Sequence, residues 1–226
     1  MLSMALFQYK YKAKSMNNAS IKQENERVIA YIDGFNLYFG IREAGYDACK
    51  WLDIYSLVKA LLKTCQVIIA VKYFTSRVSN KPDKQKRQNT YIEALETTGL
   101  EVYYGHYQAQ YVECKRCGAL WITNNEKMTD VNIATQILTD AYKDSYDMAM
   151  LISGDSDLVP PIKAIHNSFP GKRVFVAFPP KRFNHSVKAV AKGSMIIGRK
   201  KLFDNQLPEK IVKPDGYVLR KPVEWA

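Results

Sequence analysis

The feature that most constrains the fold is a short apolar run that ends in a glycine and two aspartates. Residues 148–152 read Met-Ala-Met-Leu-Ile, and Ser-Gly-Asp-Ser-Asp follows directly at 153–157. A continuous apolar run of this length, ended by Gly and Asp, is typical of a parallel strand covered on both faces. Residues 158–166 then have helical spacing, with two prolines near the start, where a missing N–H costs little. Because ligands collect at the carboxyl ends of strands in open α/β sheets, this pattern predicts a functional site at Asp155 and Asp157.

Apolar strand patterns alternate with amphipathic helix patterns along most of the chain. Strands are predicted at 28–33, 67–75, 100–107, 148–152, 171–178 and 194–197, and helices at 37–44, 51–63, 81–98, 129–143, 158–166 and 184–192. This alternation predicts a mostly parallel sheet with right-handed crossovers. The expected fold class is therefore α/β, a three-layer sandwich with a central sheet of about five strands flanked by helices.

Length and composition fit one domain with extensions. The chain has 226 residues, of which 47% are hydrophobic and 24% charged, and both values are ordinary for a globular domain. We expect an N-terminal extension at 1–26, the domain at 27–203, and a tail at 204–226 that packs on the domain. The tail contains three prolines and shows no helical period.

Several absences in the sequence bear on where the protein resides. No apolar run approaches the roughly 20 residues that span a bilayer. The first seven residues lack the basic segment that begins a signal peptide. Four cysteines, only two of them closely spaced, do not make a disulfide framework in a chain this long. We therefore expect a cytoplasmic protein that does not enter a membrane.

The net charge is +11, from 33 Lys and Arg against 22 Asp and Glu, and it is unevenly spread. Between Leu158 and Phe203 there are ten Lys or Arg and no Asp or Glu. A second basic cluster runs from Lys72 to Arg87, where Asp83 is the one acidic residue. A positive field of this size favours a polyanion as the binding partner. Nucleic acid is the first candidate and an anionic membrane surface the second. The alternative is a solvated surface that keeps the protein soluble.

A second predicted strand also ends in a carboxylate, Asp33, and Asn36 follows it three residues later. Asp130 stands at the start of the helix predicted from 129. If the strands that end at 33 and 152 are neighbours where the winding of the sheet reverses, their carboxylates converge on one crevice. Clustered carboxylates require raised pKa values or a divalent cation, and hard oxygen ligands suit Mg²⁺ or Mn²⁺. Such an ion can activate water to hydrolyse a phosphodiester.

Each of these acids also has a simpler interpretation. Asp157 could cap the following helix, Asp130 could favour a helix dipole, and Asp33 could be a turn residue. The combination is more specific than any one member.

Three blocks of the sequence resemble the signature blocks of NYN domains. They are Ile-Asp-Gly-Phe-Asn-Leu at 32–37, Lys-x-x-Asp-Val at 127–131, and Ser-Gly-Asp-Ser-Asp-Leu at 153–158. NYN domains belong to the PIN-like ribonuclease superfamily, and the order and spacing of the blocks look like its bacterial LabA-like branch. The resemblance covers about residues 28 to 200, and the tail from Leu207 to Trp225 also looks typical of that branch.

The resemblance implies a PIN-like fold and a metal-dependent ribonuclease that acts on RNA, which we expect to be single-stranded. By position, the residues that would hold Mg²⁺ or Mn²⁺ are Asp33, Asp130, Asp155 and Asp157, and Asn36 would orient water or phosphate. All the acidic positions are present, which favours activity. Two alternatives stay open: a non-catalytic RNA-binding or regulatory module with the same pocket, and a phosphatase that acts on a small phosphate ester.

Five basic residues are candidates for contact with nucleic acid: Lys72, Arg77, Lys127, Lys181 and Arg182. Lys72 and Arg77 lie at the end of the second predicted strand, where a phosphate backbone would cross the sheet edge. A cluster of tyrosines at 103, 104, 107 and 111 could stack on single-stranded bases, although strand alternation would bury about half of them.

Cys114-Lys-Arg-Cys117-Gly118 lies in a predicted hairpin at about 108–126 and has half of a zinc-binding pattern. A structural Zn²⁺ needs four ligands, and His106 is the nearest further candidate. The hairpin of a second chain could complete the set, which keeps a homo-oligomer open. The alternative is a pair of reduced thiols on a β-turn.

Overall fold

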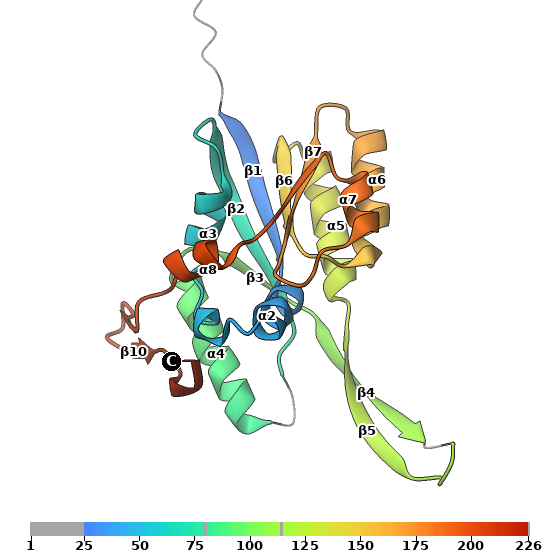
Figure 1. The fold of residues 1–226 in the computed structure, drawn as a ribbon, viewed down its shortest axis with the longest axis vertical. Coiled ribbons are helices and arrows are strands. Elements are labelled where there is room, and N and C mark those ends of the chain that lie inside the picture. The colour runs from blue at the N-terminus through green and yellow to red at the C-terminus, as the bar shows by residue number, and fades with distance from the viewer. Residues whose placement is uncertain (1–24, 79–80, 114, 226) are drawn as a thin grey trace, which may run out of the picture.

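The computed structural model describes residues 25–78, 81–113 and 115–225, except for the side chains at 106–111 and 121–127 (Figure 1). Nearly all of the expected N-terminal extension, together with Cys114, lies outside the described residues. Within the described ranges, no helix is both long and apolar enough to cross a bilayer.

The centre of the molecule is a six-stranded sheet whose neighbouring strands all run parallel, in the order β3-β2-β1-β6-β7-β8. Its strands are β1 (Glu26–Asp33), β2 (Gln66–Thr75), β3 (Glu101–Tyr104), β6 (Met148–Ile152), β7 (Arg173–Phe178) and β8 (Gly193–Ile196). The chain winds outward from β1 to β3, returns to the centre at β6, and winds outward on the other side to β8. The predicted α/β class with a parallel sheet is confirmed.

Helices cover both faces of this sheet (Figure 1). On one face lie α2 (Gly34–Glu43), α3 (Ile54–Leu61), α4 (Pro82–Glu96) and α8 (Arg199–Asp204). On the other face lie α5 (Thr129–Tyr142), α6 (Val159–Ser168) and α7 (His185–Val190). Short 3₁₀ turns, η2 (Asp47–Cys49), η3 (Ser156–Leu158) and η4 (Val223–Trp225), complete the connections. The result is the three-layer arrangement that the alternating pattern predicts.

The two faces explain why β1 from Val28 to Ile32, and β6 throughout, consist of apolar and aromatic residues. Val28, Ala30 and Ile32 pack into the core beneath α2, α3 and α4, whereas Ile29 and Tyr31 pack beneath α5 and α6. Successive strand residues point to opposite faces, so a strand with a core on each side favours apolar residues at every position. Each fully buried aliphatic side chain stabilises the fold by about 1.5–3 kcal/mol relative to exposure.

A two-stranded antiparallel ribbon, β4 (His106–Glu113) and β5 (Leu120–Lys127), projects from the body of the domain (Figure 1). The strand predicted at 100–107 is therefore divided between the sheet and this ribbon. Gly105 marks the division, because its N–H donates to Thr75 O at 2.8 Å as β3 leaves the sheet. The tip of the ribbon carries the segment with Cys117, whose thiol is free and exposed.

The C-terminal segment packs on α4 and on Trp51. It contains β9 (Lys210–Val212) and β10 (Val218–Arg220), which pair with each other. Trp225 is 7% exposed and lies 6.3 Å from Trp51 and 5.6 Å from Tyr91, measured between ring centroids. Trp51 Nε1 donates to Pro208 O at 2.8 Å. Helix α8, which precedes this segment, has no counterpart among the predicted elements.

Candidate active site

The ends of β1 and β6 meet at the point where the winding of the sheet reverses. The two strands pair in register from Val28↔Met148 to Ile32↔Ile152. Asp33 and the Ser153–Asp157 segment, which follow these strands, therefore lie side by side at the carboxyl edge. The prediction that the two acidic strand ends are neighbours is confirmed. In open α/β sheets this switch point is where ligands bind.

Asp33 both starts α2 and faces this edge. Its side chain is the N-cap of the helix, and Oδ1 accepts the N–H of Asn36 at 2.9 Å. Oδ2 accepts the hydroxyl of Ser153 at 2.9 Å, and the residue is only 5% exposed. The helix therefore begins at Gly34, three residues before the start predicted at 37. A carboxylate is favoured here because helix N-termini leave N–H groups unpaired and stabilise negative charge.

Two further hydrogen bonds fix the segment after β6, one to α2 and one within the segment. Asn36 Oδ1 accepts the N–H of Gly154 at 3.0 Å, and Ser153 Oγ accepts the N–H of Asp155 at 3.1 Å. Asp33, Asn36 and Ser153 thus hold the segment after β6 against the first turn of α2. The oxygen of Asn36 is used in this contact, so its NH₂ group is the part left to meet a ligand.

The two acids after β6 have different surroundings. Asp155 is half-buried and caps η3, and its Oδ1 accepts the N–H of Asp157 at 2.9 Å. Asp157 is exposed on η3. The cap on the following helix that was the alternative for Asp157 is not formed, because the N-cap position of α6 is Leu158 and no side chain caps it.

Asp130 reaches the site from α5. It lies in the first turn of that helix, after Met128, whose φ of 76° is in the left-handed region. This conformation is uncommon for a residue with a Cβ, and it turns the chain from the ribbon into the helix. Met128, rather than Thr129, occupies the N-cap position.

These elements enclose a pocket of about 240 Å³. It is lined by Asp33, Phe35, Asn36, Phe39, Met128, Thr129, Asp130, Asp155 and Arg182. Three of the four predicted acids therefore border one space, and Asp157 is not part of its lining. Among the described residues, no three His, Cys, Asp or Glu side chains are close enough to enclose a metal ion by themselves.

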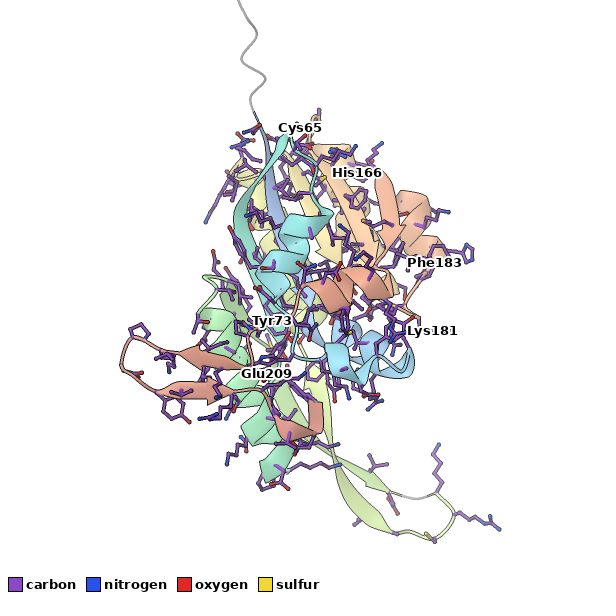
Figure 2. All side chains as sticks on the ribbon, turned by 60° about the vertical axis from the view of Figure 1, so that its left-hand side comes forward. Cys65, Tyr73, His166, Lys181, Phe183 and Glu209 are labelled. Carbon is purple, nitrogen blue, oxygen red and sulfur yellow. The ribbon has the colours of Figure 1, made fainter. Side chains whose placement is uncertain are left out.

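Arg182 can line the pocket because two glycines leave room for the backbone of its loop. A Cβ on Gly154 would lie 1.8 Å from Arg182 O, and one on Gly40 would lie 2.6 Å from Pro180 O. The loop between β7 and α7 therefore approaches both the end of β6 and α2, and Figure 2 shows Lys181 beside α2. The Arg182 guanidinium forms an ion pair with Glu43 of α2. In the described part of the chain, its buried Nε has no hydrogen-bond acceptor.

Residues 27–197 match the NYN domain family. The chain belongs to that family. The resemblance found in the three sequence blocks is thereby confirmed, and membership of the PIN-like superfamily is consistent with it. Family membership points to nuclease-type hydrolysis in general terms.

Two further proteins resemble this NYN domain protein. The 6-hydroxy-3-succinoylpyridine 3-monooxygenase HspA of Pseudomonas putida (strain DSM 28022 / S16) is 26% identical over 183 residues, which cover 64% of this chain and 57% of HspA. The chain therefore matches little more than half of that relative. A crystal structure of a protein of unknown function from Vibrio parahaemolyticus RIMD 2210633 superposes with a TM-score of 0.54 and 22% identity, covering 77% of this chain and 94% of the other. That likeness supports the fold.

The prediction that Lys72 contacts nucleic acid is wrong. Its side chain is 7% exposed, and its Nζ donates to Asp140 Oδ2 at 2.8 Å inside the NYN domain. Tyr31 OH donates to the same oxygen at 2.6 Å. Burial, followed by the hydrogen bond to Asp140, raises the pKa of Tyr31 well above its usual range, so the phenol stays a donor. The alternation of β2 turns Lys72 toward α5, where it balances a buried carboxylate.

The other basic candidates stay predictions. Arg77 is exposed two residues beyond β2, with its guanidinium 4.9 Å from the centre of the Tyr104 ring. Lys181 is exposed on the Arg182 loop. The side chains of Lys127, His106 and Cys114 lie outside the described residues, so the contact predicted for Lys127 and the zinc site at Cys114 and Cys117 are not tested.

Sequence reasoning missed two aromatic residues in the lining, Phe35 and Phe39. They are four residues apart on α2, so they lie on one side of the helix. Their rings stack with centroids 6.0 Å apart and an interplanar angle of 23°. The i, i+4 spacing directly after Asp33 was the signal available for them.

Proposed function

We propose that this NYN domain is a Mg²⁺- or Mn²⁺-dependent ribonuclease that hydrolyses phosphodiester bonds in single-stranded RNA. The observation that carries the proposal is the pocket at the switch point, where Asp33, Asp130 and Asp155 from three different elements meet Arg182. Carboxylates suit a hard divalent cation, and a guanidinium suits a phosphate. The net charge of +11 supports a polyanionic substrate.

The donor set fits a partly hydrated ion. Mg²⁺ in phosphoryl-transfer sites keeps several water ligands and is bound by one or two carboxylates together with substrate phosphate. The separated acids of this pocket are compatible with that mode. Asp33 Oδ1 accepts the N–H of Asn36 and Oδ2 accepts the hydroxyl of Ser153, and a carboxylate oxygen can bind more than one partner. Asp33, Asp130 and Asp155 would hold the ion, and the role predicted for Asp157 stays a prediction.

When bound, a divalent ion lowers the pKa of water and stabilises charge on the phosphoryl group. The remaining work falls to residues of the chain. Arg182 would hold a phosphate oxygen, and the NH₂ group of Asn36 would orient phosphate or water. Asp155 Oδ2, the oxygen not bonded to Asp157 N, would accept the proton of the attacking water. Ser153 and Gly154 would keep Asp155 in place through the hydrogen bonds described above.

Three other functions are weighed against this one. A non-catalytic RNA-binding module would use the same pocket without turnover. A small-ester phosphatase would need less positive surface than this chain carries. An oxidation like that named for HspA rests on 26% identity over part of both chains.

The test is incubation of an end-labelled single-stranded RNA with the purified protein and Mn²⁺. Cleavage that stops with a chelator, returns with Mn²⁺, and is lost in Asp155→Asn would support the proposal. Binding without cleavage by both proteins would favour the RNA-binding module. Faster hydrolysis of a small phosphate ester than of RNA would favour the phosphatase, and turnover of 6-hydroxy-3-succinoylpyridine in parallel assays would favour the oxidation.

A further inference from the structure

An aromatic stack on α2 borders the acidic pocket. Phe35 and Phe39 both line it, and the Arg42 guanidinium lies 4.7 Å from the centre of the Phe39 ring. The order Arg42, Phe39, Phe35 follows the helix back toward its N-cap, so the stack ends at the turn next to Asp33. Phe35 and Phe39 are half-buried.

Core packing does not account for these rings. The side of α2 that faces the sheet is occupied by Leu37 and Ile41, each 3% exposed, and by Gly34, which packs against β2. Gly40 packs against the loop that carries Arg182. Phe35 and Phe39 lie outside that face, where a surface helix ordinarily carries polar side chains. Two large aromatic side chains are therefore kept partly open in a pocket whose other lining residues are three aspartates, Asn36, Arg182, Met128 and Thr129.

We infer that Phe35 and Phe39 form a stacking platform for one nucleobase of the substrate, adjacent to the phosphate that the acidic pocket receives. The inference rests on the proposed function, because it takes the pocket as the place where the strand is cut. Every base has a π-face, so an aromatic platform binds bases with little sequence preference. Arg182 on the same lining supplies the positive group for the neighbouring phosphate.

The platform also selects the form of the nucleic acid. In a duplex the faces of each base are covered by its neighbours, so a protein ring can stack only on a base that has left the helix. A single strand offers such a base at little cost. Stacking on Phe35 and Phe39 would therefore make the pocket select RNA whose bases are unpaired.

The experiment uses the full chain carrying Asp155→Asn, so that bound RNA is not cut. Fluorescence anisotropy measures its affinity for a short labelled single-stranded RNA and for a set in which one base at a time is replaced by an abasic sugar. We expect one position at which base removal weakens binding by on the order of tenfold to a hundredfold. Adding Phe35→Leu should reduce that penalty to less than about twofold, while Phe35→Trp restores it.

The matched control is Phe203→Leu, because Phe203 is a 63% exposed phenylalanine on α8, outside the pocket. It should leave the abasic penalty intact. Tight binding with no position sensitive to base removal would overturn the platform and leave the proposed nuclease standing. Binding with a penalty that Phe35→Leu does not change would also overturn it. A base-dependent penalty that Phe35→Leu removes, in a protein whose wild type does not cut RNA, would support the platform and contradict the nuclease. Failure to bind any RNA would overturn both.

Discussion

At the scale of single residues, Asp33 joins folding and function in one side chain. It caps α2 through Asn36 N, receives the Ser153 hydroxyl, and lines the acidic pocket. Asn is as good an N-cap as Asp, whereas Ala costs about 1 kcal/mol at such a position. The two substitutions therefore separate the cap from the charge.

We predict that Asp33→Asn keeps the free energy of unfolding within about 1 kcal/mol of wild type and lowers Mn²⁺-dependent cleavage at least about a hundredfold. Asp33→Ala should lose both activity and stability. Urea unfolding and initial cleavage rates measure the two effects. An Asp33→Asn protein that cuts RNA at the wild-type rate would show that the carboxylate has no part in the chemistry.

A substitution at Gly154 tests how closely the loop that carries Arg182 packs against the end of β6. A Cβ there would lie 1.8 Å from Arg182 O, so Gly154→Ala must displace the loop between β7 and α7. We expect a loss of about 1–3 kcal/mol in the free energy of unfolding, as for other overpacked sites, together with weaker RNA binding. The control is Gly198→Ala, because Gly198 has φ −79° and nothing within 4 Å of an added Cβ. Equal stability of the two variants would contradict the packing described for Gly154.

At the scale of elements, the contact between β2 and α5 contains a buried charge pair. Lys72 and Asp140 are each 7% exposed, and Asp140 also accepts hydrogen bonds from Tyr31 and Gln136. Removing one partner of a buried pair leaves an uncompensated charge, which costs about 3–5 kcal/mol. This pair is therefore part of the fold's stability and is placed too deep to meet RNA.

We predict that Lys72→Met destabilises the protein by several kcal/mol, on the order of the cost of an unpaired buried charge. Lys200→Met is the matched control, since Lys200 is 87% exposed and pairs with Asp204 within α8. Such an exposed pair contributes about 0–1 kcal/mol. Urea unfolding distinguishes the two. A Lys72→Met protein of normal stability and reduced RNA affinity would restore the nucleic-acid role that the sequence indicated.

Some strands and contacts could be predicted from the sequence, and others could not. Continuous apolar runs ending in Asp identified β1 and β6 correctly and placed Asp33 beside Asp155, because a strand buried on both faces leaves no other pattern. The direction of Lys72 was missed, since a lysine in a strand looks the same whether it meets water or a buried aspartate on a later helix. The role of Gly154 was missed for a related reason. Its neighbour, Arg182, is distant in sequence, and its approach depends on the folded loop.

At the scale of the whole molecule, the uneven charge predicts strong salt dependence of RNA binding. For single strands, the slope of log K against log salt is about −0.7 per phosphate neutralised. Lys181→Ala, on the loop beside α2, should flatten the slope by about one such contact. Lys143→Ala is the control, because Lys143 is exposed at the end of α5, away from the pocket. Equal slopes for both variants would contradict a strand path over the Arg182 loop.

We propose that the switch-point carboxylates hold a divalent metal ion, and the position of bound Mn²⁺ in a crystal decides whether they do. Crystals soaked in Mn²⁺ give anomalous scattering that locates the ion without reference to any assumed chemistry. We expect a peak in the pocket, within ligand distance of at least one of Asp33, Asp130 and Asp155, that disappears in Asp155→Asn. Anomalous density only at surface acids, with none in this pocket, would contradict it.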